Sequence, residues 1–316
     1  MQFNCLADGL AQTGDFKFCS PDDLAWAPRW ALMQEEIAAV QPDVLFVQEM
    51  NHPEALAQLL PEHQMLFCPK LQSPALKCGA PPDGCVMMIR RSHYELMDVQ
   101  IMYYQMESGM NSGAIVVAAR DKRNGQGVVF ATTHLKAKAE QACEDLRCLQ
   151  VQQLLTRIRG SQRMLSAYLD SAHEAMVVLG GDFNSAPGRE VYQAVYGCGK
   201  EGGGAVDFYS LYNSSAVGPH VSSRLGSDGE APPEKPDVHA YVAGEPSFST
   251  FKIRNGEGAK RHLIDYLWLS GGPSCVLSAL WSLPTEEEIG AQGLPCPSYP
   301  SDHLAIAAKL GWRNLL

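Results

Sequence analysis

The sequence predicts an α/β protein, and two patterns in its 316 residues carry this prediction. Short apolar runs typical of buried strands alternate with stretches of helical periodicity, and no internal repeat is visible. A chain of this length could hold one or two domains. Polar residues that end the apolar runs are scattered from Asn4 to His303 and would have to meet at one site, so we expect a single domain over residues 1–316.

Three helices are predicted along the chain. Arg29–Val40 places its large apolar residues on one face and stops before Pro42, because proline cannot continue a helix. Glu140–Leu169 is a long helix and Glu190–Tyr196 a short one. The inward-facing candidates of the long helix are Leu146, Leu149, Leu154 and Ile158. The predicted strands are Met1–Asn4, Val44–Gln48, Cys85–Arg90, Ala114–Ala119, Val128–Thr133, Met176–Leu179, Leu263–Leu269 and Leu304–Leu310.

Two segments are predicted to be loops without regular structure. The segment at about 214–246 is rich in Gly, Pro and Ser with scattered acids, which favours a disordered surface insertion. The segment Gly197–Gly202 matches a dinucleotide-binding glycine pattern literally. It follows a helix and not a strand, so we interpret it as a flexible loop.

Composition narrows the range of partners and compartments. The formal net charge of −10 disfavours a long groove for a polyanion, whereas a small phosphate ester held by a few local cations is compatible with it. No run of about 18 apolar residues is present, so we expect no membrane partner. The ten cysteines are dispersed without a Cys-x-x-Cys pair, which favours a reducing, intracellular location, cytoplasmic or organellar, the mitochondrion included. No targeting segment is visible, and one lying upstream could be missing.

The tetrad Gly181-Asp182-Phe183-Asn184 is the most informative motif, because a carboxylate and an amide directly follow the apolar run Met176–Leu179. An Asp after two glycines is by itself more often a turn or a helix cap. Other predicted strand ends carry polar groups as well, and their coincidence favours one site for a hard cation and an anionic substrate. These groups are Asn4, Glu49, Asp265, Asp302 and His303.

The whole set resembles the endonuclease/exonuclease/phosphatase superfamily of Mg²⁺-dependent phosphoesterases, and within it the nocturnin branch of the CCR4-like proteins. The resemblance spans essentially the whole chain in order. It implies a four-layer sandwich, with two packed mixed β-sheets, α-helices outside them, and loops at one end that carry the site. The matching stretches are Met1–Ala7, Gln41–Glu49, Pro82–Cys85, Thr133–Ala137, Gly181–Asn184, Thr250–Arg254, Arg261–Tyr266 and Tyr299–Leu304.

The metal ligands are expected at three strand or loop ends. Glu49 is the first candidate, because a strand-end carboxylate suits Mg²⁺, which prefers oxygen and keeps several waters. Mn²⁺ is the expected substitute. The resemblance implies that Asn4 lies close to the metal and that Asp302 belongs to the same or a second metal position.

The resemblance also implies the catalytic roles. Asp182 would orient or deprotonate the attacking water, and Asn184 would hold the phosphoryl group. His303 would donate to a phosphoryl oxygen, with Asp265 keeping its imidazole protonated, because a nearby carboxylate raises the pKa of histidine. His134 would be a second phosphate contact.

A second group of residues is expected to bind the rest of the substrate. By resemblance, Lys70 and Lys136 contact phosphates, and Asn111 lies near the scissile phosphate. Arg147 is predicted to reach the same region from the long helix. Lys138 stands where nocturnins carry arginine; lysine keeps the charge but lacks the bidentate fork.

The implied activity is removal of the 2′-phosphate from NADP⁺ and NADPH, which gives NAD⁺ and NADH. The expected partner is therefore a small nucleotide. One alternative is a poly(A)-specific 3′ exoribonuclease, a deadenylase, which would bind an RNA 3′ end in a longer base-stacking channel. Another is a catalytically inactive RNA–protein scaffold on the same fold, and the full set of acids, amides and histidine argues against it.

Overall fold

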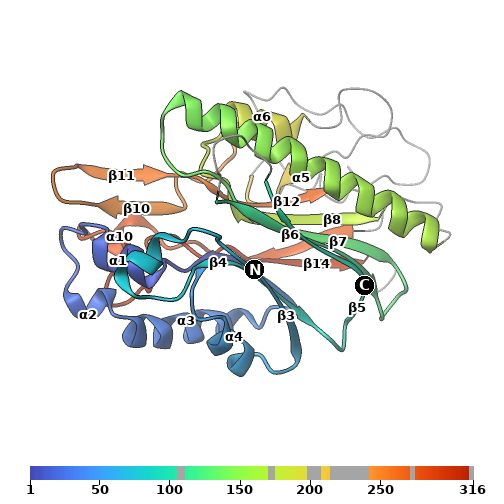
Figure 1. Cartoon of the computed structure of the whole chain (residues 1–316), viewed down its shortest axis with the longest axis horizontal. Helices are drawn as coiled ribbons and strands as arrows, with labels where there is room; N and C mark the ends of the chain where they lie inside the picture. Colours follow the sequence, from blue (N-terminus) through green and yellow to red (C-terminus); the bar gives the residue numbers. More distant parts are fainter. Residues whose placement is uncertain (105–110, 170–174, 198–207, 214–241, 271–274, 313–316) are drawn as a thin grey trace.

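The computed structural model describes residues 1–104, 111–169, 175–197, 208–213, 242–270 and 275–312. Two mixed β-sheets pack face to face in these residues (Figure 1). In spatial order, the four-stranded sheet consists of β1 (Gln2–Asn4), β2 (Val44–Met50), β4 (Gly84–Arg90) and β3 (His63–Pro69). The six-stranded sheet consists of β5 (Tyr94–Tyr103), β6 (Gly113–Asp121), β7 (Gly127–His134), β8 (Met176–Asp182), β12 (Asp265–Ser270) and β9 (Phe208–Ser210).

Helices cover both outer faces, so the predicted four-layer sandwich is confirmed (Figure 1). In that view, α5 (Gln141–Tyr168) and α6 (Glu190–Tyr196) lie above the sheets, and α3 (Trp26–Val40) and α4 (Pro53–Leu59) lie below. The shorter helices are α1 (Asp8–Thr13), α2 (Pro21–Leu24), the 3₁₀ helix η1 (Pro74–Cys78) and α10 (Glu286–Ile289). Two two-stranded antiparallel sheets complete the described fold, the hairpin of β10 (Thr250–Ile253) with β11 (Ala259–His262), and the pair of β13 (Cys275–Leu280) with β14 (Ala308–Trp312).

The central strands are apolar throughout because both of their faces are buried. In β6, Ala114, Val116 and Ala118 pack under the outer helices. The alternate residues Ile115 and Val117 pack between the two sheets. Since side chains of a strand point to opposite faces in turn, a strand buried on both sides needs a continuous apolar run. This explains why such strands could be predicted from the sequence.

The strand directions bring the polar ends together at one edge of the sandwich. The pairs β1–β2 and β7–β8 are parallel, so their carboxyl ends coincide. Strand β12 runs antiparallel to β8, and its first residue, Asp265, is therefore opposite Asp182. Gly181 permits the close approach of β7, since a Cβ atom there would lie 2.3 Å from the Thr133 carbonyl oxygen.

The two ends of the chain meet in the same sandwich. Gln2 and Ile306 form an antiparallel bridge, with backbone N–H to carbonyl distances of 2.8 and 3.0 Å in the two directions. The segment that carries Asp302 and His303 therefore lies directly beside the first strand.

Some predicted elements differ from the structure. The last strand begins at Ala308, and the residues from Leu304 to Ala307 are buried without forming a strand of the main sheets. Leu149 on α5 is 48% exposed, although Leu154 and Ile158 are buried as predicted. Several strands were not predicted, because they carry polar residues or few apolar ones; these are β3, β5, β9, β10, β11 and β13.

The predicted insertion at about 214–246 lies mostly outside the described residues, as does most of the glycine-rich loop 197–202. The last residues of the predicted insertion, from Val242 on, are described, and they pack against the rest of the protein. Val242 packs against the core beneath the outer helices. The Glu245 carboxylate accepts hydrogen bonds from the Tyr192 hydroxyl at 2.6 Å and the Ser210 hydroxyl at 3.1 Å. The insertion was thus predicted to extend too far.

Within the described residues, none of the helices combines the length and apolar character needed to cross a membrane.

Candidate active site

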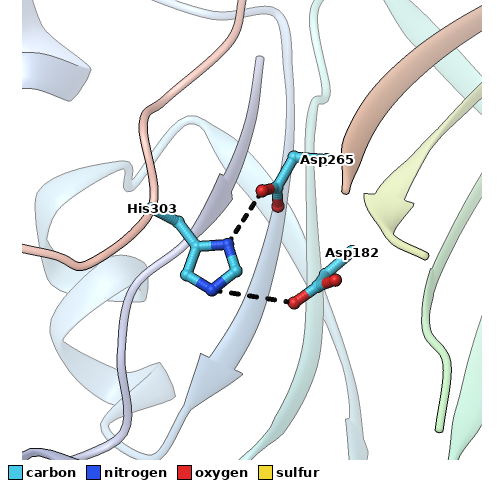
Figure 2. Close-up of side chains that lie close together, drawn as sticks. All are labelled: Asp182, Asp265 and His303. Atoms are coloured by element: carbon cyan, nitrogen blue, oxygen red, sulfur yellow. Dashed lines mark hydrogen bonds and ion pairs between the residues drawn. The ribbon is translucent and has the colours of Figure 1, made fainter. Parts of the chain in front are cut away.

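Two carboxylates and one imidazole form the centre of the site (Figure 2). His303 Nδ1 lies 2.8 Å from Asp265 Oδ2, and His303 Nε2 lies 3.9 Å from Asp182 Oδ2. All three side chains are buried, and each has a potential ligand atom within 4.8 Å of those of the other two. The group joins the end of β8, the start of β12 and the segment before β14.

Asp265 has the partners that a buried carboxylate needs. Its two oxygens accept hydrogen bonds from the Gln2 amide at 3.1 Å and the Ser249 hydroxyl at 2.7 Å, besides the contact with His303. Without such partners, burial of a carboxylate would cost several kcal/mol. Asp265 therefore fixes the orientation of the His303 ring and the nitrogen that carries its proton.

Glu49 is joined to Asp182 through Asn4. The Asn4 amide nitrogen donates to Glu49 Oε1 at 3.2 Å and to Asp182 Oδ2 at 2.9 Å. Its amide oxygen accepts from the Leu6 backbone N–H at 3.1 Å, which sets the orientation of the amide. In this arrangement Asn4 holds the two carboxylates, and its place close to the metal stays a prediction.

Glu49 adopts an uncommon backbone conformation. Its φ is +59°, in the left-handed region that non-glycine residues rarely enter, and the register of β2 shifts locally. The Ala7 backbone N–H donates to Glu49 Oε2 at 3.1 Å and holds the carboxylate in place. Such conformations concentrate at functional sites, because the surrounding structure must compensate for their cost.

The electrostatics of Asp182 indicate a place for a cation. Burial, and then the charge of Asp265, raise the pKa of Asp182 to about 7. Two carboxylates in a dry region are unfavourable unless a positive charge lies between or beside them.

The two oxygens of Asp302 have different surroundings, and His303 Nε2 lies 3.9 Å from Oδ1. Its Oδ2 lies 2.9 Å from the Lys252 ammonium, whereas Oδ1 is buried and has no hydrogen-bond partner among the described residues. Burial alone would raise the pKa of Asp302, but Lys252 and His303 outweigh it and lower the pKa to about 2. Asp302 is therefore an ionised carboxylate, and its Oδ1 accepts no hydrogen bond from the described residues.

Lys252 is a central residue that the sequence analysis did not assign, although it lies in the matching stretch Thr250–Arg254. Its ammonium is 3.0 Å from His303 Nε2. Burial would lower the pKa of Lys252, but Asp302 and Glu49 outweigh burial and raise it.

The contact between Lys252 and His303 is compatible with only one protonation state of the ring. A lysine ammonium can donate to Nε2 only when the imidazole is neutral. Burial lowers the pKa of His303, yet Asp265 outweighs burial and raises it to about 9, which favours the protonated ring. An anionic oxygen bound beside both nitrogens would remove the conflict, because the ammonium and the protonated ring could both donate to it.

His134 and Lys70 border the same region. His134 Nε2 lies 3.5 Å from Asp182 Oδ2, and its Nδ1 is buried without a partner among the described residues. Burial and the charge of Lys70 lower the pKa of His134 well below its usual range, so the ring is neutral. The Lys70 ammonium lies 2.5 Å from the buried carboxylate of Asp83, another residue not assigned from the sequence.

The side-chain amides of Asn184 and Asn111 both form hydrogen bonds with the protein backbone. Asn184 has a φ of +50° and donates from its side chain to the Leu135 carbonyl at 3.1 Å. Its backbone N–H donates to Asp182 Oδ1 at 2.9 Å, so it lies beside the centre of the site. Asn111 bonds to both the N–H and the carbonyl of Gln72, and no contact among the described residues joins it to the carboxylates.

Lys136 and Lys138 follow His134 on a loop that Arg147 holds. Arg147 is buried, and its Nη1 donates to the carbonyls of Lys136 and Lys138 at 2.7 Å each. Its Nε and Nη2 bond to the buried carboxylate of Glu144 at 3.0 and 2.6 Å. The guanidinium is thus occupied by the protein, and this geometry gives Arg147 a supporting role beneath the loop in place of the predicted substrate contact.

The fold and the buried cluster of acids and histidine are those of phosphoric ester hydrolases. The sequence pattern of the Endonuclease/Exonuclease/phosphatase family matches residues 1–303, and the chain belongs to this family.

Within the family, the chain is similar to nocturnins. It is 32% identical to the nocturnin of Rattus norvegicus over 322 residues, which covers 99% of this chain and 65% of the relative. It thus spans just under two thirds of that protein. The structure of the human nocturnin catalytic domain with a bound sulfate anion superposes with a TM-score of 0.67 and 26% identity, covering 98% of this chain and 91% of that one. The Ccr4 3′–5′-exoribonuclease subunit of Debaryomyces hansenii is 24% identical over 342 residues, 98% of this chain and 38% of the relative.

Replacement of Arg147 by Met should test its supporting role. We expect the free energy of unfolding to fall by about 3 kcal/mol, because the substitution removes the buried ionic partner of Glu144 at 2.6 Å and leaves only Arg189 at 3.7 Å. Urea unfolding measures the change, and Arg157→Met on the exposed face of the same helix is the control, expected within about 0.5 kcal/mol of the wild type. Unchanged stability of the Arg147 variant would return Arg147 to the list of substrate contacts.

Proposed function

We propose that the protein is an Mg²⁺-dependent phosphoesterase that removes the 2′-phosphate of NADP⁺ and NADPH. The observation that carries this proposal is the convergence of Lys252 and His303 beside Asp182. Two groups that are both cationic when protonated point at one position, and a phosphoryl oxygen there would accept from both. The adjacent carboxylates suit the cation that such chemistry needs.

The residues fit a hard divalent cation. Glu49, Asp182 and Asp302 offer carboxylate oxygens, the ligands that Mg²⁺ prefers, and Asp302 Oδ1 accepts no hydrogen bond from the described residues. When bound, the cation would neutralise charge on the phosphoryl group and lower the pKa of a coordinated water. Mn²⁺ shares this preference for oxygen and is the expected substitute.

The side chains of the chain would share the remaining work. Asp182 would orient the attacking water and accept its proton. His303, held by Asp265, would donate from Nε2 to a phosphoryl oxygen, and Lys252 would donate to the same group. Asn184 lies beside Asp182, and this position supports its predicted role in holding the phosphoryl group.

A small dinucleotide is the favoured substrate for two reasons. The formal net charge of −10 disfavours a long nucleic-acid groove. Identity to the nocturnin is 32%, against 24% to the Ccr4 exoribonuclease subunit. The lysines at 70, 136 and 138 would hold the phosphates that join the two nucleosides. We place the protein inside the cell, in the cytoplasm or an organelle, where reduced cysteines persist.

Two alternatives remain distinct from this proposal. The similarity to Ccr4 supports a deadenylase that cleaves the 3′ end of poly(A). A catalytically inactive RNA–protein scaffold would have no need of the buried acids and histidine, and their presence argues against it.

One assay separates the three functions. Purified protein with Mg²⁺ is given NADPH and oligo(A) in separate reactions, and the release of inorganic phosphate and of AMP is measured. We expect phosphate from NADPH and little AMP from oligo(A). AMP release that rises steeply with oligomer length, without phosphate from NADPH, would replace the proposal with the deadenylase. No release from either would leave the scaffold.

Replacement of Glu49 by Gln should remove nearly all hydrolysis with the fold intact. A neutral amide is a weaker ligand for Mg²⁺, so we expect activity to fall roughly a hundredfold or more and metal affinity to fall with it. Phosphate release, calorimetric Mg²⁺ titration and circular dichroism give the three readouts. Glu62→Gln, at the opposite end of β3 from the site, should match the wild type. Full turnover by Glu49→Gln at saturating Mg²⁺ would remove Glu49 from the metal site.

Replacement of Lys136 by Ala should weaken the binding of NADPH. Loss of one charge-assisted phosphate contact corresponds to about 1.5–3 kcal/mol, so KM should rise roughly ten- to a hundredfold. Hydrolysis of adenosine 2′-monophosphate, which lacks the diphosphate bridge, should suffer much less. Lys122→Ala, in the turn between β6 and β7 at the far end of the sheet, serves as the control. Equal losses for both substrates would contradict a role of Lys136 at the bridge.

A further inference from the structure

Arg29 is a buried guanidinium outside the group of residues that meet at the site. It lies in α3 and is 1% exposed. Its Nη1 donates to the carbonyls of Cys5 at 2.8 Å and Pro300 at 3.0 Å. Its Nη2 donates to the Leu6 carbonyl at 2.7 Å and to Asp8 Oδ1 at 3.2 Å. One side chain thus ties together two segments that lie far apart in the sequence.

The carbonyls that Arg29 binds belong to residues next to the site. Cys5 and Leu6 directly follow Asn4, the residue that joins the carboxylates of the site. Pro300 precedes the Ser301–His303 segment, which carries the other acid and the imidazole. Burial of a charged group is costly unless the group has enough partners. Arg29 has one ionic partner and three backbone carbonyls, so its bonds balance the charge and also hold the loops in place.

A second tie joins the same two segments. The Ser301 hydroxyl donates to the Asn4 carbonyl at 2.7 Å, and the His303 N–H donates to the Ser301 hydroxyl at 3.2 Å. Asp8, the ionic partner of Arg29, also contacts the segment after β2. Asp8 Oδ2 lies 2.7 Å from His52 Nε2, three residues beyond Glu49. All three segments that surround the metal region are therefore linked to the start of α3.

We infer that Arg29 is a positioning residue that sets the spacing of Asn4 and Glu49 from Asp302 and His303. This inference rests on the proposed function, in which these groups act on one phosphoryl group. The planar guanidinium has donors on separate nitrogens and can serve two loops at once, whereas lysine has its donors on one atom. Misplacement of reacting groups by about 1 Å can lower a rate by about a hundredfold.

The test compares Arg29→Lys with Arg123→Lys. Arg123 binds the buried carboxylate of Asp121 through Nε at 2.8 Å and Nη2 at 2.6 Å, in the turn at the far end of the sheet from the site. Both variants therefore replace a guanidinium that makes several hydrogen bonds, in Arg29 to the loops beside the site and in Arg123 to a carboxylate away from it. Below the unfolding temperature of each variant, we expect kcat for NADPH to fall at least about tenfold in Arg29→Lys and KM to change little, with both constants near wild type in Arg123→Lys.

Two further measurements keep the inference testable if Arg29→Lys does not fold or NADPH is not the substrate. Ser301→Ala loosens the parallel tie without a buried charge and should lower kcat in the same direction. Mn²⁺ affinity, measured by electron paramagnetic resonance without any substrate, should be several-fold weaker in both variants than in Arg123→Lys. Absence of phosphate release by the wild type would reject the proposed function, and the Mn²⁺ affinities would then decide on Arg29. Wild-type kcat and wild-type Mn²⁺ affinity in Arg29→Lys and Ser301→Ala would overturn the inference.

Discussion

The site depends on hydrogen bonds that cross from one sheet to the other, and the Asn4 amide makes the central one. It belongs to the four-stranded sheet and donates to Asp182 of the six-stranded sheet, while it also holds Glu49. Apolar packing between the sheets is not directional, so it brings the layers together without setting the spacing of the strand ends. The hydrogen bonds between the sheets set the spacing of the strand ends, because each bond requires a particular distance and angle.

Charge is distributed in the site differently from the protein as a whole. The chain carries a formal net charge of −10, yet Lys252, Lys70 and His303 gather around the buried carboxylates. Water screens charges weakly in this buried region, so neighbouring acids and bases interact strongly. These interactions keep the groups ionised or fix their orientation. It also provides separate places for a cation and for an anion, and this pairing is what phosphoryl chemistry requires.

The sequence predicted those parts of the site that lie at the ends of fully buried strands, because an acid after an apolar run is visible in one dimension. Asp182 and Glu49 are of this kind. Lys252 lies between the apolar residues Phe251 and Ile253 on a short strand, where in the sequence a lysine looks like ordinary surface. Arg147 shows the opposite case, since its charge suggested a ligand contact and the structure places its guanidinium on Glu144. Pairings such as these are set by tertiary contacts between distant residues, which local patterns do not encode.

The bridge between Gln2 and Ile306 can form only late in the synthesis of the chain. The first strand supplies Asn4, but its neighbour on one side, at Ile306, is synthesised long after it. Closing so long a loop is entropically costly and slow, and contacts between distant positions dominate this fold. A nascent chain that has not yet reached residue 303 holds most of the carboxylates and lacks the imidazole that Asp265 orients. The group of Asp182, Asp265 and His303 can therefore form only after residue 303 has been synthesised.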